Sequence, residues 1–285
     1  MRLLIANHID AALLNQIDQR MFVHRMLWLS KPGDVIVLPC APDLLFVEHV
    51  AKHIGFNPAS LRFIDLSIFC EGDRLFQDDA LTKTSVLDKL QEIANEITEI
   101  LPLWPSPQVA RMAQVTGLTS KLPGCLFFAQ AGDEFSNSKA NFRRISAGIG
   151  IMTASGAVCR TVQDAVQVSQ QLLAENRAIV VKQSTNHAGA GNMLIVLQEE
   201  PEGFSGGFRY RVNLNGQLAS LSELFDDKWG WASCNGTNSV TIEAFVENIG
   251  TVYAEFMVRD AMVDYIGSGT LCYKEGRLTT EAAPL

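Results

Sequence analysis

The chain of 285 residues is 47% hydrophobic and 19% charged, which excludes an intrinsically disordered protein and leaves room for one large domain or two ordinary ones. Its formal net charge of −8 argues against a nucleic-acid partner, because such proteins need clustered Lys and Arg, although a local basic pocket for a small anion is still allowed. No apolar run approaches the roughly 20 residues of a membrane span, so we expect no membrane partner. The six scattered cysteines form no C-x-x-C pair, which is typical of free thiols in a reducing cytoplasm.

The first third of the chain alternates short β-rich runs with a helical pattern. The predicted strands are residues 2–7, 34–39 and 61–67. Residues 43–55 have helical spacing and end at Gly55, a natural C-cap. His49 and His53 on this helix could share a metal, but no third ligand is placed nearby and a solvated helix face is the alternative. Strands that alternate with helices predict a parallel sheet in an α/β fold.

Two further helices and a strand are predicted before residue 131. Residues 85–101 carry one apolar stripe at helical spacing, formed by Val86, Leu90, Ile93, Ile97 and Ile100. A second short helix over residues 108–117 closes at Gly117. Residues 125–130, of sequence CLFFAQ, are predicted as the last strand of this half.

A polar stretch at residues 131–144 predicts the domain boundary. We therefore expect an N-terminal domain over residues 1–133 and a second, α+β domain over residues 134–285.

Two helices are predicted to open the second domain. The first begins at Lys139, after serines and asparagines that can serve as N-caps, and runs to Gly148 or Gly150. The second begins at Thr161, with Asp164 three residues on, which resembles a capping box.

After residue 178 short β-rich runs alternate with turn residues, which predicts antiparallel strands. These runs are residues 178–183, 192–198, 208–214, 239–246, 251–260 and 261–273. Residues 215–238 are polar and rich in Gly and Asn, and we expect them to be the least regular part.

The segment 179–196, IVVKQSTNHAGAGNMLIV, places Lys182 at the end of a strand and two glycines in the following loop. The run after Gly191 is too short and too β-rich for the helix of a dinucleotide fold, and no Lys-Ser/Thr follows the glycines as in a Walker-A loop. The remaining interpretation of this segment is two antiparallel strands joined by a glycine loop. Gly189 and Gly191 could let backbone N–H groups approach a phosphate above Lys182, and a plain hairpin with an edge lysine is the alternative.

Three segments, in this order and spacing, resemble the ATP-grasp superfamily. They are the K-x-x-F-R helix that starts at Lys139, the VVK strand that ends at Lys182 before the glycine loop, and the Glu-x-x-apolar hinge at residues 243–246. In that family the two lysines contact nucleotide phosphates, the glycine loop covers them, and the hinge backbone and its glutamate hold the adenine.

The resemblance implies ATP as the bound nucleotide and assigns no catalytic residue. The implied nucleotide-binding residues are Lys139, Lys182, His187, Gly189, Gly191, Glu243, Phe245, Val246 and Glu255. Glu255 is the looser match, to a ribose-binding glutamate, because its interval from Glu243 is longer than in the D-alanine ligase type.

The N-terminal half resembles the pre-ATP-grasp domain of a bacterial subgroup that includes pheganomycin-type peptide ligases. The resemblance lies in residues 4–9, 25–39 and 137–144. ATP-grasp proteins hold Mg²⁺ through an acidic residue on a late strand and a Glu-x-Asn pair. These 285 residues supply no such pair, so we expect an incomplete ATP-grasp domain whose Mg²⁺ ligands lie outside this chain.

The implied reaction is an ATP-dependent ligation of a carboxylate to an amine through an acylphosphate. The substrates would be amino acids or peptides in small-molecule biosynthesis. Two alternatives are an ATP-grasp kinase and a non-catalytic nucleotide-binding or assembly protein, the latter favoured by the missing metal ligands. A homo-oligomer is left open.

Other polar and aromatic residues have a functional and a plainer interpretation. Arg143 and Arg144 could extend the phosphate pocket or lie on the exposed side of their helix. Asn192 could touch phosphate or acceptor, or serve the turn. Trp229 and Trp231 could line an acceptor site, or cover the edge of a core.

Overall fold

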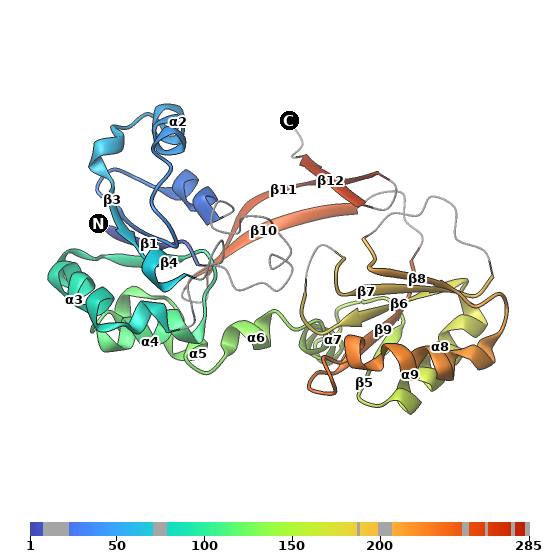
Figure 1. Cartoon of the computed structure of the whole chain (residues 1–285). Coiled ribbons are helices and arrows are strands. Elements are labelled where there is room, and N and C mark those ends of the chain that lie inside the picture. Colours follow the sequence, from blue (N-terminus) through green and yellow to red (C-terminus); the bar gives the residue numbers. More distant parts are fainter. Residues whose placement is uncertain are drawn as a thin grey trace. The chain divides into compact units, whose positions relative to one another are not determined.

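The structure is a computed structural model, and it divides into two compact units, residues 1–133 and 134–285 (Figure 1). The described residues are 1–7, 23–70, 79–186, 189–198, 207–246, 251–259, 262–274 and 277–282.

The first unit is built on a four-stranded sheet in the order β3-β2-β1-β4. Its strands are β1 (Arg2–Ile5), β2 (Val35–Leu38), β3 (Arg62–Asp65) and β4 (Glu99–Pro102). Every pairing between them is parallel, which confirms the predicted parallel sheet. All four residues of β2 are buried, as expected of a strand covered on both faces.

Helices cover both faces of this sheet. They are α2 (Leu44–Ile54), α3 (Thr84–Ile93), α4 (Pro107–Val115) and α5 (Cys125–Phe128), with a 3₁₀ helix η2 (His24–Leu29). Leu3 and Ile5 pack in the cluster that includes α3 and α4, whereas Leu4 packs with η2 and α2. The helix predicted to end at Gly55 is confirmed, and Gly55 adopts the left-handed conformation with φ 92°.

Two predictions in this unit are wrong. The helix predicted over residues 85–101 ends at Ile93, and Ile97 and Ile100 are buried around β4. Pairing with β1 satisfies the backbone there, and β-branched residues suit a strand. The predicted strand 125–130 begins with helix α5 after Gly124, because a short apolar run alone does not distinguish the two structures.

The second unit contains a five-stranded sheet in the order β5-β9-β6-β7-β8. Its strands are β5 (Gly156–Cys159), β6 (Ala178–Gln183), β7 (Asn192–Val196), β8 (Tyr210–Asn213) and β9 (Val240–Ala244). The pairings are antiparallel, as predicted, except that β8 runs parallel to β7. The purely antiparallel prediction is wrong at that strand, because a long connection separates β7 from β8.

The two faces of this sheet differ. On one face, α8 (Val162–Glu175) and α9 (Leu221–Ala232) cover a core that includes Val181 and Ile242. On the other, Val180 belongs to a smaller apolar cluster, and α7 (Lys139–Gly148) packs against β5 and β9. The short helix α6 (Gly132–Ser136) precedes α7.

The caps predicted for these helices are confirmed, but one helix was not predicted. Ser138 caps α7, and Thr161 accepts a hydrogen bond from the backbone N–H of Asp164 at the start of α8. Helix α9 lies within the segment expected to be irregular. Its Gly- and Asn-rich flanks hide a helical pattern in which Leu221 and Phe225 are fully buried.

A separate three-stranded sheet follows the hinge. Its strands β10 (Thr251–Arg259), β11 (Met262–Lys274) and β12 (Arg277–Ala282) pair antiparallel in chain order. Among the described helices, none has the length and apolar character needed to cross a membrane.

None of the six cysteines forms a disulfide, as predicted, and burial sets the reactivity of their thiols. Burial raises the pKa of Cys159 to about 11, with a smaller contribution from Asp164, and also raises the pKa of Cys125. At pH 8 we expect iodoacetamide to modify exposed Cys272 first and to spare Cys125 and Cys159 until the chain unfolds, because the thiolate is the nucleophile. Peptide mass spectrometry over time measures this, and equal rates at Cys159 and Cys272 would contradict it.

Candidate functional site

Lys182 and Glu243 lie on neighbouring strands and on the same face of the five-stranded sheet. In the antiparallel register of β6 and β9, Lys182 is opposite Thr241 and Val180 is opposite Glu243. Lys182 and Glu243 are therefore diagonal neighbours across the strand pair. Ile242, between Thr241 and Glu243, belongs to the core on the other face.

Glu243 is held between two cations. Lys182 Nζ donates to Glu243 Oε2 at 2.5 Å, and Arg143 Nη1 donates to Glu243 Oε1 at 2.7 Å. The side chains of Arg143 and Glu243 are 11% and 14% exposed, whereas that of Lys182 is 31% exposed. Of these three groups, Lys182 is thus the one most open to a ligand.

Arg143 also ties α7 to the start of β5. Its Nη2 donates to the carbonyl oxygens of Ala154 at 2.9 Å and Gly156 at 2.6 Å. Gly156 is required there, because a Cβ would lie 2.1 Å from the backbone oxygen of Ile242. Arg143 is therefore not on the exposed side of its helix, and it contacts the pocket described below through Glu243 without lining it, so a role at the phosphates stays a prediction. Arg144 is exposed.

Lys139 lies beside the loop that follows β6. Its backbone N–H donates to Ser184 O at 2.7 Å, and its Nζ donates to Asn186 O at 2.5 Å. The hydroxyls of Ser138 and Ser184 are also hydrogen-bonded, at 2.7 Å. The N-terminal end of α7 is thus fixed to the start of the glycine loop, which brings Lys139 and this loop together as the sequence resemblance implies.

Gly189 in this loop is required by a close backbone approach, whereas Gly191 lies close to two side chains. Gly189 has φ 80°, and a Cβ on it would lie 2.3 Å from the backbone of Gly207. A Cβ on Gly191 would lie 2.8 Å from Asn186 Cβ and 3.0 Å from Gln183 Oε1. Strands β6 and β7 form the predicted antiparallel hairpin around this loop. These contacts account for both glycines without a ligand, so their phosphate-binding role stays a prediction.

A cavity of about 290 Å³ opens on this face of the sheet. Its lining includes four predicted site residues, Lys182, Glu243, Phe245 and Val246. The remaining lining residues are Ala154, Val180, Asn192, Phe208 and Ala244. The cavity therefore joins the end of the VVK strand to the hinge at residues 243–246.

Phe208 is the main lining residue that the motifs did not predict. It packs with Phe245 against a cluster that includes Val180 and Leu194. Its position one residue after a Gly-Gly pair and just before a strand gives no functional signal. Asn192, which was weighed for phosphate or turn contacts, lines the cavity as the first residue of β7 and donates to Gly207 O at 3.3 Å.

The other predicted site residues are not among those that line this cavity. Lys139, Gly189 and Gly191 belong to the neighbouring α7 and loop, and Glu255 is exposed on β10, in the separate sheet. His187 lies outside the described residues. The ribose role of Glu255 thus stays a prediction.

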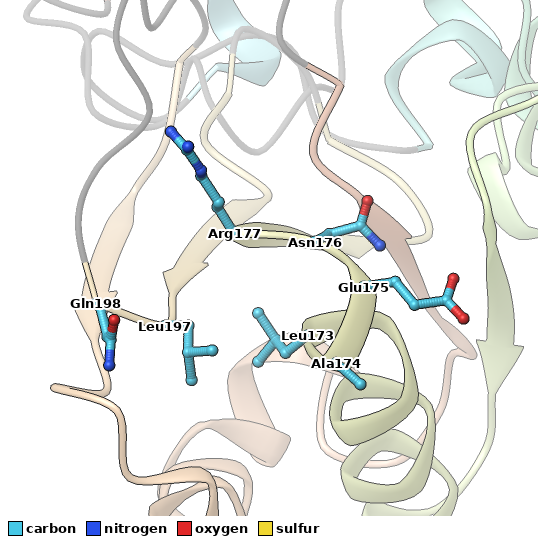
Figure 2. A pocket seen from close by; sticks show the side chains of 7 residues that line it. All are labelled: Leu173, Ala174, Glu175, Asn176, Arg177, Leu197 and Gln198. Carbon is cyan, nitrogen blue, oxygen red and sulfur yellow. The ribbon is translucent and has the colours of Figure 1, made fainter.

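A second, larger cavity of about 450 Å³ lies at the end of α8. Figure 2 shows Leu173 and Leu197 facing each other there, with Arg177 directed away from them. It includes none of the predicted site residues. The smaller cavity, which contains four of the predicted site residues, is therefore the candidate site.

No cluster of three or more His, Cys, Asp or Glu side chains suited to a metal is found in the described part of the chain. The rings of His49 and His53 have centroids 4.3 Å apart and are tilted by 44°, and both contact the Trp28 ring edge-on. This surface aromatic group accounts for the histidine pair without a metal.

Trp229 and Trp231 are partly buried against the core under α8 and α9. Trp231 also contacts Tyr210 edge-on, with ring centroids 4.9 Å apart. Both tryptophans therefore cover a core edge, which confirms the plainer of their two interpretations.

Comparisons with known proteins agree with this fold. The family model of the pre-ATP-grasp domain matches residues 23–118. No curated protein matches the chain. The biotin carboxylase domain of Hydrogenobacter thermophilus 2-oxoglutarate carboxylase is 14% identical, with a TM-score of 0.54 over 95% of this chain and 50% of that one.

Two further solved structures are similar at lower TM-scores. N5-carboxyaminoimidazole synthetase from Staphylococcus aureus is 11% identical (TM-score 0.49; 97% of this chain, 56% of that one). An L-amino acid ligase from Bacillus licheniformis is 15% identical (TM-score 0.43; 100% and 57%). This chain thus spans about half the length of these structures. Residues 23–118 are thus similar to the pre-ATP-grasp domain, and the chain shares its fold with the biotin carboxylase domain.

Proposed function

We propose that the second unit binds ATP in the cavity lined by Lys182, Glu243, Phe245 and Val246. The observation that carries this proposal is that a strand-end lysine and the hinge, more than 60 residues apart in the chain, meet at one cavity beside a glycine loop. The biotin carboxylase domain with the same fold was solved with MgADP, ADP and bicarbonate, which also supports a nucleotide ligand.

The apolar part of the cavity suits a flat base. Val180, Phe208 and Phe245 supply apolar walls, and its volume of about 290 Å³ is near the lower end of small-molecule sites, roughly 300–1,000 Å³. An adenine there would stack on aromatic and aliphatic surface while Lys182 faces the phosphates.

The hinge backbone offers a specific contact for the base. The N–H of Phe245 donates to Ala178 O at 3.0 Å, so it is already used. The N–H of Val246 has no hydrogen-bond partner among the described residues. We therefore assign Val246 N–H, together with the Glu243 carboxylate, to the edge of the adenine.

The proposed reaction of the whole protein is carboxylate–amine ligation, with peptide-bond formation as the finer assignment. A substrate carboxylate oxygen bonds to the γ-phosphorus of ATP and ADP leaves. The amine nitrogen then bonds to the acyl carbon, phosphate leaves, and the amine loses a proton. The part of this chain is to hold the phosphates with Lys139, Lys182 and the loop amides. Mg²⁺ would neutralise phosphate charge, and we derive no step through it.

Two other functions use the same site. An ATP-grasp kinase would stop after phosphoryl transfer, and a nucleotide-binding or assembly protein would not turn over. The free thiols support a reducing, cytoplasmic setting for any of them, and homo-oligomerisation stays a prediction.

We expect ATP to bind this chain saturably, with inorganic tripolyphosphate as a competitor, in titration calorimetry. Phosphate release in the presence of mixed amino acids separates the functions. Release that needs an added amine supports the ligase, release with carboxylate alone supports the kinase, and binding without release supports the binding protein. A chain that binds neither ATP nor tripolyphosphate would overturn the proposed site.

A further inference from the structure

We propose that Arg143 is a positioning residue that neutralises Glu243, so that the charge of Lys182 remains available to a polyphosphate. This inference rests on the proposed nucleotide site and adds to it the residue that sets its charge. None of the sequence motifs gives Arg143 this role, and its partner Glu243 lies 100 residues further along the chain.

The two carboxylate oxygens of Glu243 are divided between the two cations. Arg143 holds Oε1 at 2.7 Å, and Lys182 holds Oε2 at 2.5 Å. Because two cations flank one carboxylate, these three groups have a net charge of +1. Without Arg143 the remaining pair would be neutral, and Lys182 would be fully engaged by Glu243.

Arg143 is held in place by several hydrogen bonds, whereas Lys182 can exchange Glu243 for another partner. The guanidinium makes three hydrogen bonds, one to Glu243 and two to the carbonyls of Ala154 and Gly156. Its side chain is 11% exposed. Lys182 lines the cavity and is 31% exposed, and its ammonium is a single flexible point charge. A phosphate can therefore attract Lys182 away from Glu243 while Arg143 keeps the carboxylate compensated.

The test uses inorganic tripolyphosphate, which has no base, so its affinity depends on the charge of the site and not on contacts with adenine. We expect Arg143→Gln to weaken tripolyphosphate binding about tenfold, because the site loses its net charge. The double variant Arg143→Gln with Glu243→Gln should recover to within about threefold of wild type, since Lys182 is again uncompensated. Arg143→Lys should retain most of the affinity.

Arg144→Gln is the matched control, because it removes the same charge from the same helix at an exposed position, and its affinity should not change. Thermal unfolding shows which variants are folded. If Arg143→Gln does not fold, Glu243→Gln alone provides the test, since it should bind tripolyphosphate at least as tightly as wild type.

A purely structural tether through Ala154 and Gly156 predicts a different result. In that case the double variant would stay as weak as Arg143→Gln, which would overturn the role of Arg143 while the nucleotide site stands. The proposed role of Arg143 would also be overturned if Arg143→Gln bound tripolyphosphate as tightly as wild type, or if Glu243→Gln bound it more weakly. A wild type that binds neither tripolyphosphate nor ATP would overturn the proposed site and, with it, this inference.

Discussion

Lys182→Ala is expected to weaken ATP binding about 100-fold, equivalent to about 2.7 kcal/mol. Lys182 is the pocket-lining cation, and a charge-assisted hydrogen bond to phosphate is among the stronger single contacts. Its removal also leaves Glu243 paired with Arg143 alone, so the remaining pair is neutral. Titration calorimetry with ATP measures the loss. The fold should be little affected, because Lys182 is 31% exposed and Glu243 keeps one partner.

Three further variants test whether this loss of ATP affinity is specific to the proposed site. Lys182→Arg keeps the charge in a larger planar group and should retain part of the affinity. Lys139→Ala should also lose most of the affinity, because its ammonium lies at the glycine loop. Lys52→Ala, at an exposed position on α2, is the control and should bind as wild type does. If Lys182→Ala and Lys139→Ala both bound ATP as tightly as wild type, the nucleotide site would be wrongly placed.

The spacing of the motifs predicted several of the residues that line the candidate site. Lys182, Glu243, Phe245 and Val246 were predicted from short patterns, and they line one cavity. Their binding role is still a prediction. Arg143 belongs to the K-x-x-F-R pattern, but its ion pair with Glu243 could not be predicted from the sequence. Glu243 lies 100 residues away, and only the packing of α7 against β9 brings the two together.

The fold was predictable where local pattern and tertiary contacts agree. The parallel strands of the first unit and the β6–β7 hairpin follow from apolar runs bounded by turn residues. The errors lie where the same pattern fits two structures. Ile97 and Ile100 are buried as expected, but around a strand, because the edge of β1 was available for pairing. Helix α9 was missed because its Gly- and Asn-rich flanks outweighed the buried positions within it.

Gly189→Val is expected to weaken ATP binding at least tenfold and to lower the free energy of unfolding by about 1–3 kcal/mol. At φ 80° any side chain is strained, and its Cβ would lie 2.3 Å from the backbone of Gly207. Gly207 precedes Phe208, which lines the cavity, and accepts a hydrogen bond from Asn192, which also lines it. A shift of the loop should therefore move two walls of the cavity. Titration calorimetry and urea unfolding measure the two effects.

Substitutions at two other glycines distinguish the effect of backbone strain from the effect of simply adding a side chain. Gly148→Ala lies at the end of α7, where a Cβ meets no atom within 4 Å, so it should stabilise the helix by about 0.5–1 kcal/mol and leave ATP binding unchanged. Gly191→Ala should have an intermediate effect, because its nearest neighbours are the side chains of Asn186 and Gln183, which can shift. Wild-type stability and affinity in Gly189→Val would mean that the contact with Gly207 is not maintained in solution. The glycine loop would then not be coupled to the cavity wall, and the loop amides would lose their proposed place over the phosphates.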